Sequence, residues 1–214
     1  MKNWPSKQAK IRIVNQIISA ASDYKMNLVG KTFLYWFEGR YIEVVYRARD
    51  FSHLTGVETS LSANDFYKEA VRGTLRDTQI WFSKRHPHSL CVRKMSHLLQ
   101  FVKITNSPLL ILESITTDTA IYKFGLTELE CTVCLDHDLD DLGIPKSNML
   151  IAKSLRDEDS FGRGQDAFEV NMIFCKANDA KLYDRCTFDD GKYSKADLSE
   201  EVVEKLSPAL FLAT

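Results

Sequence analysis

The segment Phe51–Val57, F-S-H-L-T-G-V, contains the residues best suited to chemistry. His53 carries an imidazole, the side chain that most readily accepts or donates a proton near neutral pH. Thr55 adds a hydroxyl, and Gly56 lets the backbone turn sharply or approach a ligand closely. Because the segment lies between a predicted hairpin and a capped helix, we interpret it as an active-site corner. The residues alone leave open a histidine that only hydrogen-bonds the local backbone.

Three further segments carry cations that are suited to binding a phosphate. Lys153, Ser154 and Arg156 lie at the end of a predicted strand, where two cations and a hydroxyl would stabilise negative charge. Lys94 lies on a predicted helix, and Lys123 interrupts an otherwise apolar strand. Each has a structural alternative, namely an ion pair with a neighbouring acid, simple solvent exposure, or a charge that discourages pairing at a sheet edge.

Two other groupings have the residue types of metal or redox sites. The run Asp136–Asp141, D-H-D-L-D-D, offers carboxylates and a histidine, but it lacks EF-hand spacing, and we favour an acidic turn. Cys131 and Cys134 lie within an apolar, strand-like stretch. Residues three apart point to opposite faces of a strand, so buried thiols are the preferred interpretation. The sequence therefore predicts no metal and no other cofactor.

The composition is typical of a folded cytoplasmic protein. The chain has 214 residues, of which 44% are hydrophobic, and its formal net charge of −1 gives no overall basic excess for nucleic-acid binding. No signal peptide and no membrane-spanning segment is recognisable, and five cysteines agree with a reducing compartment. The motifs of nucleotide-binding loops, serine hydrolases and zinc proteases are missing.

The periodicity of apolar residues predicts an α+β fold with a mainly antiparallel sheet and with helices concentrated in the N-terminal half. A long amphipathic helix is expected over residues 7–28, followed by a hairpin of strands 31–37 and 41–48. Residues 157–166 are expected to form a polar loop, and the apolar residues 209–212 to dock on the body or on a partner. Further helices are expected over 62–73, 78–82, 91–103 and 197–206, and further strands over 109–115, 119–124, 130–135, 149–154 and 168–176.

Four segments resemble one family of nucleases. They are Asp50–Val57, Leu61–Lys68, Arg93–Leu98 and Tyr122–Thr127, of which F-x-H-L-T-G-V is the most specific. The family is the fourth of the phage barnase–EndoU–colicin–RelE-like nuclease families, which occur on phages and mobile elements of low-GC Gram-positive bacteria. The resemblance implies a ribonuclease core of the barnase and RelE type over residues 1–180. Residues 181–214 would then form an extension with a short helix and the apolar tail.

The resemblance also implies a ribonuclease that needs no metal, with RNA, tRNA included, as its partner. RNA carries its own nucleophile, the ribose 2′-hydroxyl, so the enzyme need only move protons and stabilise the phosphate. On the matching positions we assign His53 as general base or acid and Thr55 as the residue that orients phosphate or ribose. Lys153 and Arg156 would bind the phosphate and stabilise its charge. Further substrate contacts are assigned to Lys94, Lys123 and Ser154.

Two other functions remain open at this point. One is a non-catalytic protein of a mobile element, which would bind a host factor, a defence component or an inhibitor through aromatic surfaces and the apolar tail. The other is a metal-dependent phosphoesterase, for which Asp136, Asp138 and Asp140 would have to converge on one ion. A groove that holds His53 within reach of two cations would favour the ribonuclease. The sequence does not predict the oligomeric state.

Overall fold

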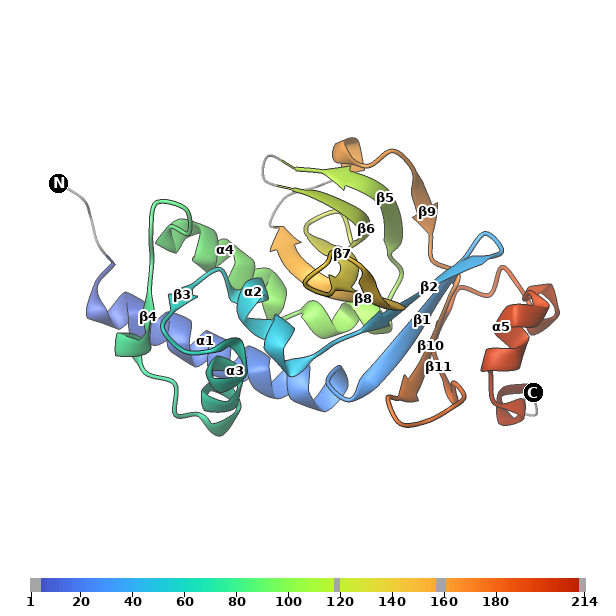
Figure 1. The fold of residues 1–214 in the computed structure, drawn as a ribbon, viewed down its shortest axis with the longest axis horizontal. Helices are drawn as coiled ribbons and strands as arrows, with labels where there is room; N and C mark the ends of the chain where they lie inside the picture. The colour runs from blue at the N-terminus through green and yellow to red at the C-terminus, as the bar shows by residue number, and fades with distance from the viewer. Residues whose placement is uncertain (1–4, 118–119, 157–160, 212–214) are drawn as a thin grey trace.

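The computed structural model describes residues 5–117, 120–156 and 161–211 of the chain. Helices α1–α4 gather at one end of the molecule beside a large, curved sheet, and α5 lies at the other end (Figure 1). The fold class is therefore α+β with a mostly antiparallel sheet, which confirms that part of the prediction.

The large sheet contains nine strands within the described residues, in the order β11-β10-β1-β2-β8-β7-β6-β5-β9. Neighbouring strands are antiparallel except β2 and β8, which are parallel and pair at Val44 with Leu150 and at Val45 with Ile151. A separate small sheet is formed by β3 and β4. The strands are β1 (Lys31–Phe37), β2 (Arg40–Val45), β3 (Glu58–Thr59), β4 (Ile80–Trp81), β5 (Leu110–Thr116), β6 (Ile121–Thr127), β7 (Thr132–Leu139), β8 (Pro145–Arg156), β9 (Ala167–Glu169), β10 (Met172–Ala177) and β11 (Arg185–Asp189).

The long helices begin and end where local signals in the sequence place them. The hydroxyl of Ser62 accepts a hydrogen bond from the backbone N–H of Asp65 at 3.1 Å, and Gly73 ends the same helix with φ +72°. None of the helices in the described ranges is both long and apolar enough to cross a bilayer. The helices are α1 (Lys7–Asn27), α2 (Phe51–Thr55), α3 (Ala63–Arg72), α4 (His88–Leu98) and α5 (Glu200–Lys205).

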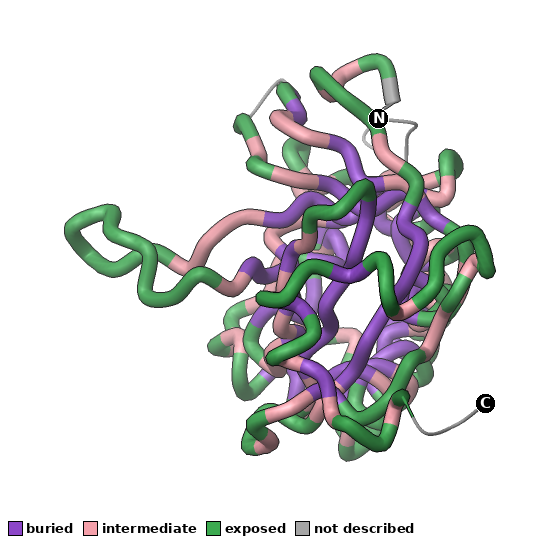
Figure 2. The backbone as a smooth tube through the Cα atoms, turned by 90° about the vertical axis from the view of Figure 1, so that its right-hand side faces the viewer, coloured by how far each residue is buried: buried purple, intermediate pink, exposed green. Residues whose placement is uncertain are grey.

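Both faces of the central strand β1 are buried, because a different set of helices covers each face. Phe33 and Tyr35 belong to the main core, in which α1–α4 pack against the sheet. Leu34 and Trp36 point to the opposite face, where Val202 of α5 joins a smaller apolar cluster. Figure 2 shows this buried centre enclosed by exposed loops. The sheet is therefore a rigid base from which loops and strand ends can present side chains.

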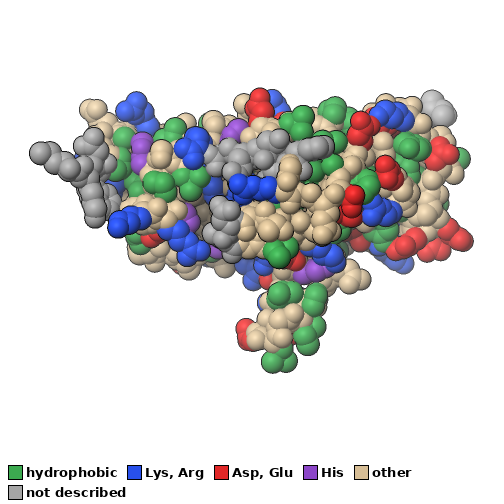
Figure 3. All heavy atoms as spheres, turned by 90° about the horizontal axis from the view of Figure 1, so that it is seen from above, with side chains coloured by type: hydrophobic (Ala, Val, Ile, Leu, Met, Phe, Trp, Pro, Cys, Tyr) green, Lys and Arg blue, Asp and Glu red, His purple; other side chains and the backbone are tan. Residues whose placement is uncertain are grey.

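A two-stranded arm projects from the sheet where β7 and β8 extend past their neighbours (Figure 2). Residues 139–148 are exposed along the whole arm. The side-chain carboxylate of Asp140 orders the tip, since it accepts hydrogen bonds from the backbone N–H groups of Leu142 and Ile144, both at 2.9 Å. Leu142 and Ile144 themselves are 83% and 57% exposed. The arm therefore presents an apolar tip to solvent (Figure 3).

Several elements differ from the sequence-based expectations. Residues 78–82 do not form one helix, because a 3-10 helix (Asp77–Gln79) ends within this range and β4 follows it. The expected strand 168–176 is two strands, because β9 pairs with β5 whereas β10 pairs with β1. The strand β11 was not expected at all, and it pairs with β10. Of the expected loop 157–166, residues 157–160 lie outside the described residues, and so does residue 212 of the tail.

Candidate active site at the α2 corner

His53 lies on α2, a short helix, rather than in the turn that the sequence suggested. The helix buries Phe51 and Leu54 in the main core. Because these residues are three apart, they share one face, and His53 is left on the solvent side. His53 is exposed. Its imidazole can therefore meet a ligand that arrives from solution.

Thr55 and Gly56 form the end of this helix and hold its shape. Thr55 is fully buried, and its hydroxyl donates to the carbonyl oxygen of Ser52 at 2.8 Å. The expected contact between Thr55 and a substrate therefore needs correction, because the side chain is enclosed in the closing turn of α2. Gly56 has φ +74°, a left-handed conformation that favours glycine. A Cβ atom at Gly56 would lie only 2.9 Å from Cδ of Lys94.

Lys94 is thus brought to the corner by helix packing. It lies on α4, which packs against α2, and its aliphatic chain runs across Gly56. The residue is only 7% exposed, so most of its side chain is enclosed between the two helices. The packing brings Lys94 next to the histidine segment, and its contact with substrate stays a prediction.

Lys153 reaches the same region through the register of the sheet. The parallel pair Val45–Ile151 is followed, two residues later on each strand, by Arg47 and Lys153. On β7 and β8, Cys134 pairs with Ser154 and Leu135 with Ala152, which leaves Lys153 as the extra residue of a β-bulge. A bulge redirects a side chain and often occurs beside functional sites. Since α2 follows β2 and packs against β8, the carboxyl end of this parallel pair lies at the α2 corner.

A network of ion pairs fixes the cations that precede His53. Arg47 binds both carboxylate oxygens of Asp50 at 2.8 Å and also donates to Asp138 of β7. Arg49 donates to Asp138 at 2.6 Å, and Nζ of Lys146 lies 3.8 Å from the same carboxylate. Burial works to raise the pKa of Asp138, but the hydrogen bond and charge of Arg47, together with the charges of Arg49 and Lys146, lower it overall. Three cations therefore share two carboxylates.

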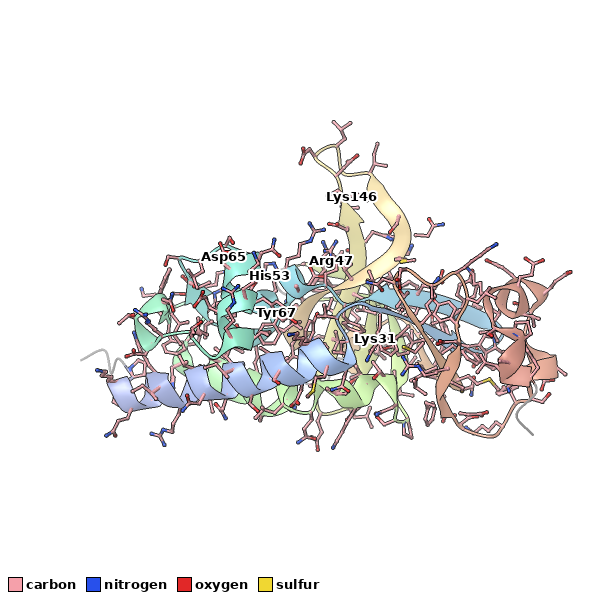
Figure 4. The ribbon with its side chains drawn as sticks, turned by 90° about the horizontal axis from the view of Figure 1, so that it is seen from below. Lys31, Arg47, His53, Asp65, Tyr67 and Lys146 are labelled. Atoms are coloured by element: carbon pink, nitrogen blue, oxygen red, sulfur yellow. The ribbon has the colours of Figure 1, made fainter. Side chains whose placement is uncertain are left out.

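Figure 4 shows how these groups lie relative to one another. His53 from α2, Arg47 from the end of β2 and Lys146 from the arm all lie along one side of the molecule. Arg47 and Arg49 were not selected from the sequence, although R-A-R-D directly precedes the histidine segment and could have indicated them. Their partner Asp138 depends on the placement of β7, which no local pattern reveals.

Arg156 and Ser154 are not brought to this corner. Leu155 faces the helix-covered core, so its neighbours Ser154 and Arg156 face the other side of β8. Arg156 donates to the hydroxyl of Thr117 at 3.2 Å, and its guanidinium lies 5.9 Å from the ring centre of Tyr122. The expectation that Arg156 and Ser154 join His53 at one phosphate is corrected by this strand alternation.

Lys123 lies in a separate pocket at the other end of β2. Its ammonium lies 3.0 Å from Nε2 of His137 on the neighbouring strand. The pocket has a volume of about 330 Å³ and is also lined by Tyr41 and Glu43 of β2. Lys123 is therefore positioned to meet a ligand, but not at the α2 corner.

The carboxylates of the acidic run do not meet at one point. Asp138 is bound by the arginines of the α2 corner, whereas Asp140 caps the tip of the arm. Across the parts of the chain that the structure describes, no three histidine, cysteine or acidic side chains come together as a metal-binding group. Cys131 and Cys134 are free thiols, and burial raises the pKa of Cys131 to about 11. The arrangement gives no support to a metal-dependent phosphoesterase.

Comparison with known proteins assigns most of the chain to one family. Residues 16–192 match the family described as phage-Barnase-EndoU-ColicinE5/D-RelE like nuclease 4. No curated protein and no solved structure matches the chain. The matched range includes α2 and the parallel strands β2 and β8, and it ends before α5.

Proposed function

The chain belongs to the phage-Barnase-EndoU-ColicinE5/D-RelE like nuclease 4 family, and from this we propose that it is a metal-independent endoribonuclease. The fold supports the proposal, since α1–α4 cover one face of a mostly antiparallel sheet, as the family's ribonuclease core leads us to expect. We place this core in residues 1–180, with the helices concentrated in its N-terminal half. The extension 181–214 stays attached to it, because β11 continues the same sheet.

The observation that carries the proposal is an exposed imidazole four residues after Arg49, a cation that Asp138 holds in place. His53 would take the proton of the ribose 2′-hydroxyl or give a proton to the leaving oxygen. Within the part of the chain that the structure describes, Arg47, Arg49 and Lys146 share two carboxylates, so the corner keeps a positive field for a phosphodiester. Transesterification through the 2′-hydroxyl would release a cyclic phosphate, and none of these steps needs a metal ion.

The remaining residues take different parts in this proposal. Lys153 and Lys94 would stabilise the charge that develops on the phosphate. Thr55 would act as a positioning residue, because it fixes the end of the helix that carries His53. Arg156 and Ser154 would meet substrate only on the other face of β8. RNA, with tRNA among its forms, would be the substrate, and the cytoplasm the place of action.

The proposal is tested by incubating the protein with total RNA and with a defined tRNA, each with and without EDTA. We expect cleavage in both conditions, with products that end in a cyclic phosphate. The variant His53→Ala should cleave about 100- to 10,000-fold more slowly, as expected for the loss of one acid–base group. The variant His97→Ala, which removes a half-exposed histidine from α4, serves as the matched control. Equal rates for His53→Ala and the parent would remove His53 from the mechanism.

A second function is favoured by the arm. Its tip exposes Leu139, Leu142 and Ile144, of which Leu142 is 83% exposed. Exposed apolar side chains on a well-ordered projection are typical of protein-binding surfaces. A non-catalytic interaction protein that binds a host or defence factor, or a nuclease held by an inhibitor, would use such a tip. The absence of any RNA cleavage in the experiment above would favour this alternative.

A further inference from the structure

A polar pocket lies between the sheet and the C-terminal helix α5, at the end of β2 that is remote from His53. It is lined by residues of β2, β6, β7, β8 and α5. Its volume of about 330 Å³ falls at the lower end of the range of small-molecule sites, which is about 300–1,000 Å³. The wall formed by α5 lies beyond residue 192, where the family match ends. The complete pocket is therefore a feature of this chain that the matched region does not contain.

Both carboxylates that line the pocket already have partners. Glu43 accepts a hydrogen bond from the hydroxyl of Tyr183 at 2.6 Å and pairs with Nζ of Lys205 at 3.2 Å. Glu201 accepts a hydrogen bond from the hydroxyl of Tyr41. Burial and this carboxylate raise the pKa of Tyr41, so the phenol remains a neutral donor. Lys205 therefore balances the charge of Glu43, whereas Glu201 keeps its negative charge and accepts from a neutral phenol.

Lys123 and His137 have no such compensation. Among the described residues, no carboxylate pairs with Lys123, and its ammonium contacts Nε2 of His137 at 3.0 Å. Because an ammonium only donates, Nε2 accepts and the ring proton lies on Nδ1. Nδ1 of His137 is buried without a hydrogen-bond partner. Lys123 thus has no directly bonded carboxylate among the described residues, and His137 holds one unsatisfied N–H group.

An anion between these two side chains would give Lys123 a charged partner and would accept a hydrogen bond from the imidazole. Lys123 would donate to the anion instead of to the ring. The imidazole could then carry its proton on Nε2 and donate to the same anion, while Nδ1 would no longer hold a buried N–H. The pocket is therefore arranged for a negatively charged group at this position.

The side chains around the anion position indicate the chemical type of the rest of the ligand. Tyr41 and Phe124 line the pocket, together with the apolar Ile42 and Leu150. Aromatic side chains stack on any nucleobase, because every base has a π-face. From this geometry we propose that the pocket binds one nucleotide, with its phosphate on Lys123 and His137 and its base or ribose against the aromatic walls.

The pocket and the α2 corner are joined by β2. Arg47 at the corner lies four positions after Glu43 in the pocket, which is about 13 Å along an extended chain. An RNA strand held at His53 would reach the pocket only by passing from the face of the sheet that α2 covers to the face that α5 covers. This link to RNA rests on the proposed function, whereas nucleotide binding itself does not.

The test measures binding of adenosine 5′-monophosphate, uridine 5′-monophosphate and inorganic phosphate by titration calorimetry. A single-stranded DNA oligonucleotide is a further probe. It is not cleaved by transesterification, because it lacks the 2′-hydroxyl. We expect Lys123→Gln and His137→Gln to weaken binding of the nucleotides by at least about tenfold, the factor that corresponds to one lost charge-assisted contact. Lys25→Gln, which changes an exposed lysine of α1, is the matched control, and thermal melting verifies the fold of each variant.

The outcomes separate the pocket from the nuclease. Binding of free mononucleotides that depends on Lys123 and His137 supports the pocket, even if no RNA is cleaved by the parent protein. Binding of the oligonucleotide alone, with the same dependence, supports the pocket and identifies a nucleotide within a strand as its occupant. The proposal is overturned if none of the nucleotide probes binds, or if Lys123→Gln and His137→Gln bind as tightly as Lys25→Gln. It is also overturned if inorganic phosphate binds as tightly as the nucleotides, because the aromatic walls would then contribute nothing.

Discussion

Gly56 offers the sharpest test of how the α2 corner is built. Replacement by alanine introduces a Cβ at φ +74° and 2.9 Å from Cδ of Lys94. The left-handed conformation costs an L-residue about 1–2 kcal/mol. The close contact adds about 1–3 kcal/mol, the usual cost of overpacking, because the Lys94 chain is enclosed and has little room to move. We therefore expect Gly56→Ala to lower the free energy of unfolding by about 2–5 kcal/mol.

Gly73 provides the matched control for the backbone part of this cost. It also ends a helix, with φ +72°, and nothing lies within 4 Å of the position of its Cβ. Gly73→Ala should therefore lower the free energy of unfolding only by the cost of the left-handed backbone, about 1–2 kcal/mol. Urea denaturation measures both variants, and in a chain of this size each 1 kcal/mol also lowers Tm by about 2–4 °C.

A double-mutant cycle with Lys94→Ala isolates the contact itself. Shortening Lys94 removes Cδ, so Gly56→Ala in that background should cost no more than Gly73→Ala. The cleavage assay is run in parallel, because displacement of Lys94 should also reduce activity in the single variant. If Gly56→Ala costs the same with and without Lys94, or no more than Gly73→Ala, the proposed packing of α4 on the corner is refuted.

Two further substitutions probe the charged groups on either side of β2. Asp138→Asn should make stability less dependent on pH in the acid range, since the carboxyl has a lowered pKa in the fold. The stabilisation by the Asp138 carboxylate is fully present above its unfolded pKa of about 3.9, and it is lost as the pH falls through the lower pKa of the folded protein. Thermal melts of parent and variant should therefore converge in strong acid. Tyr183→Phe removes the donor to Glu43 from a fully buried position and should cost about 1–3 kcal/mol in urea denaturation. An unchanged stability would show that Lys205 alone satisfies Glu43.

The elements that the sequence predicted well are those with local causes. α1 and α3 have apolar residues at helical spacing, and α3 also has its capping signals at Ser62 and Gly73. The division of residues 168–176 into β9 and β10 has no local cause, since it follows from a change of partner strand. The same holds for the parallel pairing of β2 with β8, because strands far apart in the sequence choose their neighbours through the whole fold.

The residues of the candidate site also fall into two groups, those with a local signal in the sequence and those whose position depends on the whole fold. His53 was found from its residue type and its neighbours in the sequence. The burial of Thr55 follows from a helix that was not expected, in which Thr55 lies one turn after Phe51 and shares its buried face. The exclusion of Arg156 follows from alternation along β8, whose phase is set by the bulge at Lys153. A site that is assembled across strands thus needs the register, whereas a site within one segment can be recognised from the segment alone.

The near-neutral charge of the chain does not argue against a nucleic-acid substrate, because fields in solution are local. At physiological ionic strength, charges more than about 8 Å apart are largely screened from one another. The acidic side chains gather towards the end of the molecule that carries α5, among them Glu200, Glu201 and Glu204 (Figure 3). The cations around Asp138 lie at the opposite end of β2, so an approaching phosphodiester meets their surplus and not the net charge of −1. The local charge at the α2 corner, and not the sum over the chain, therefore determines whether a polyanion binds there.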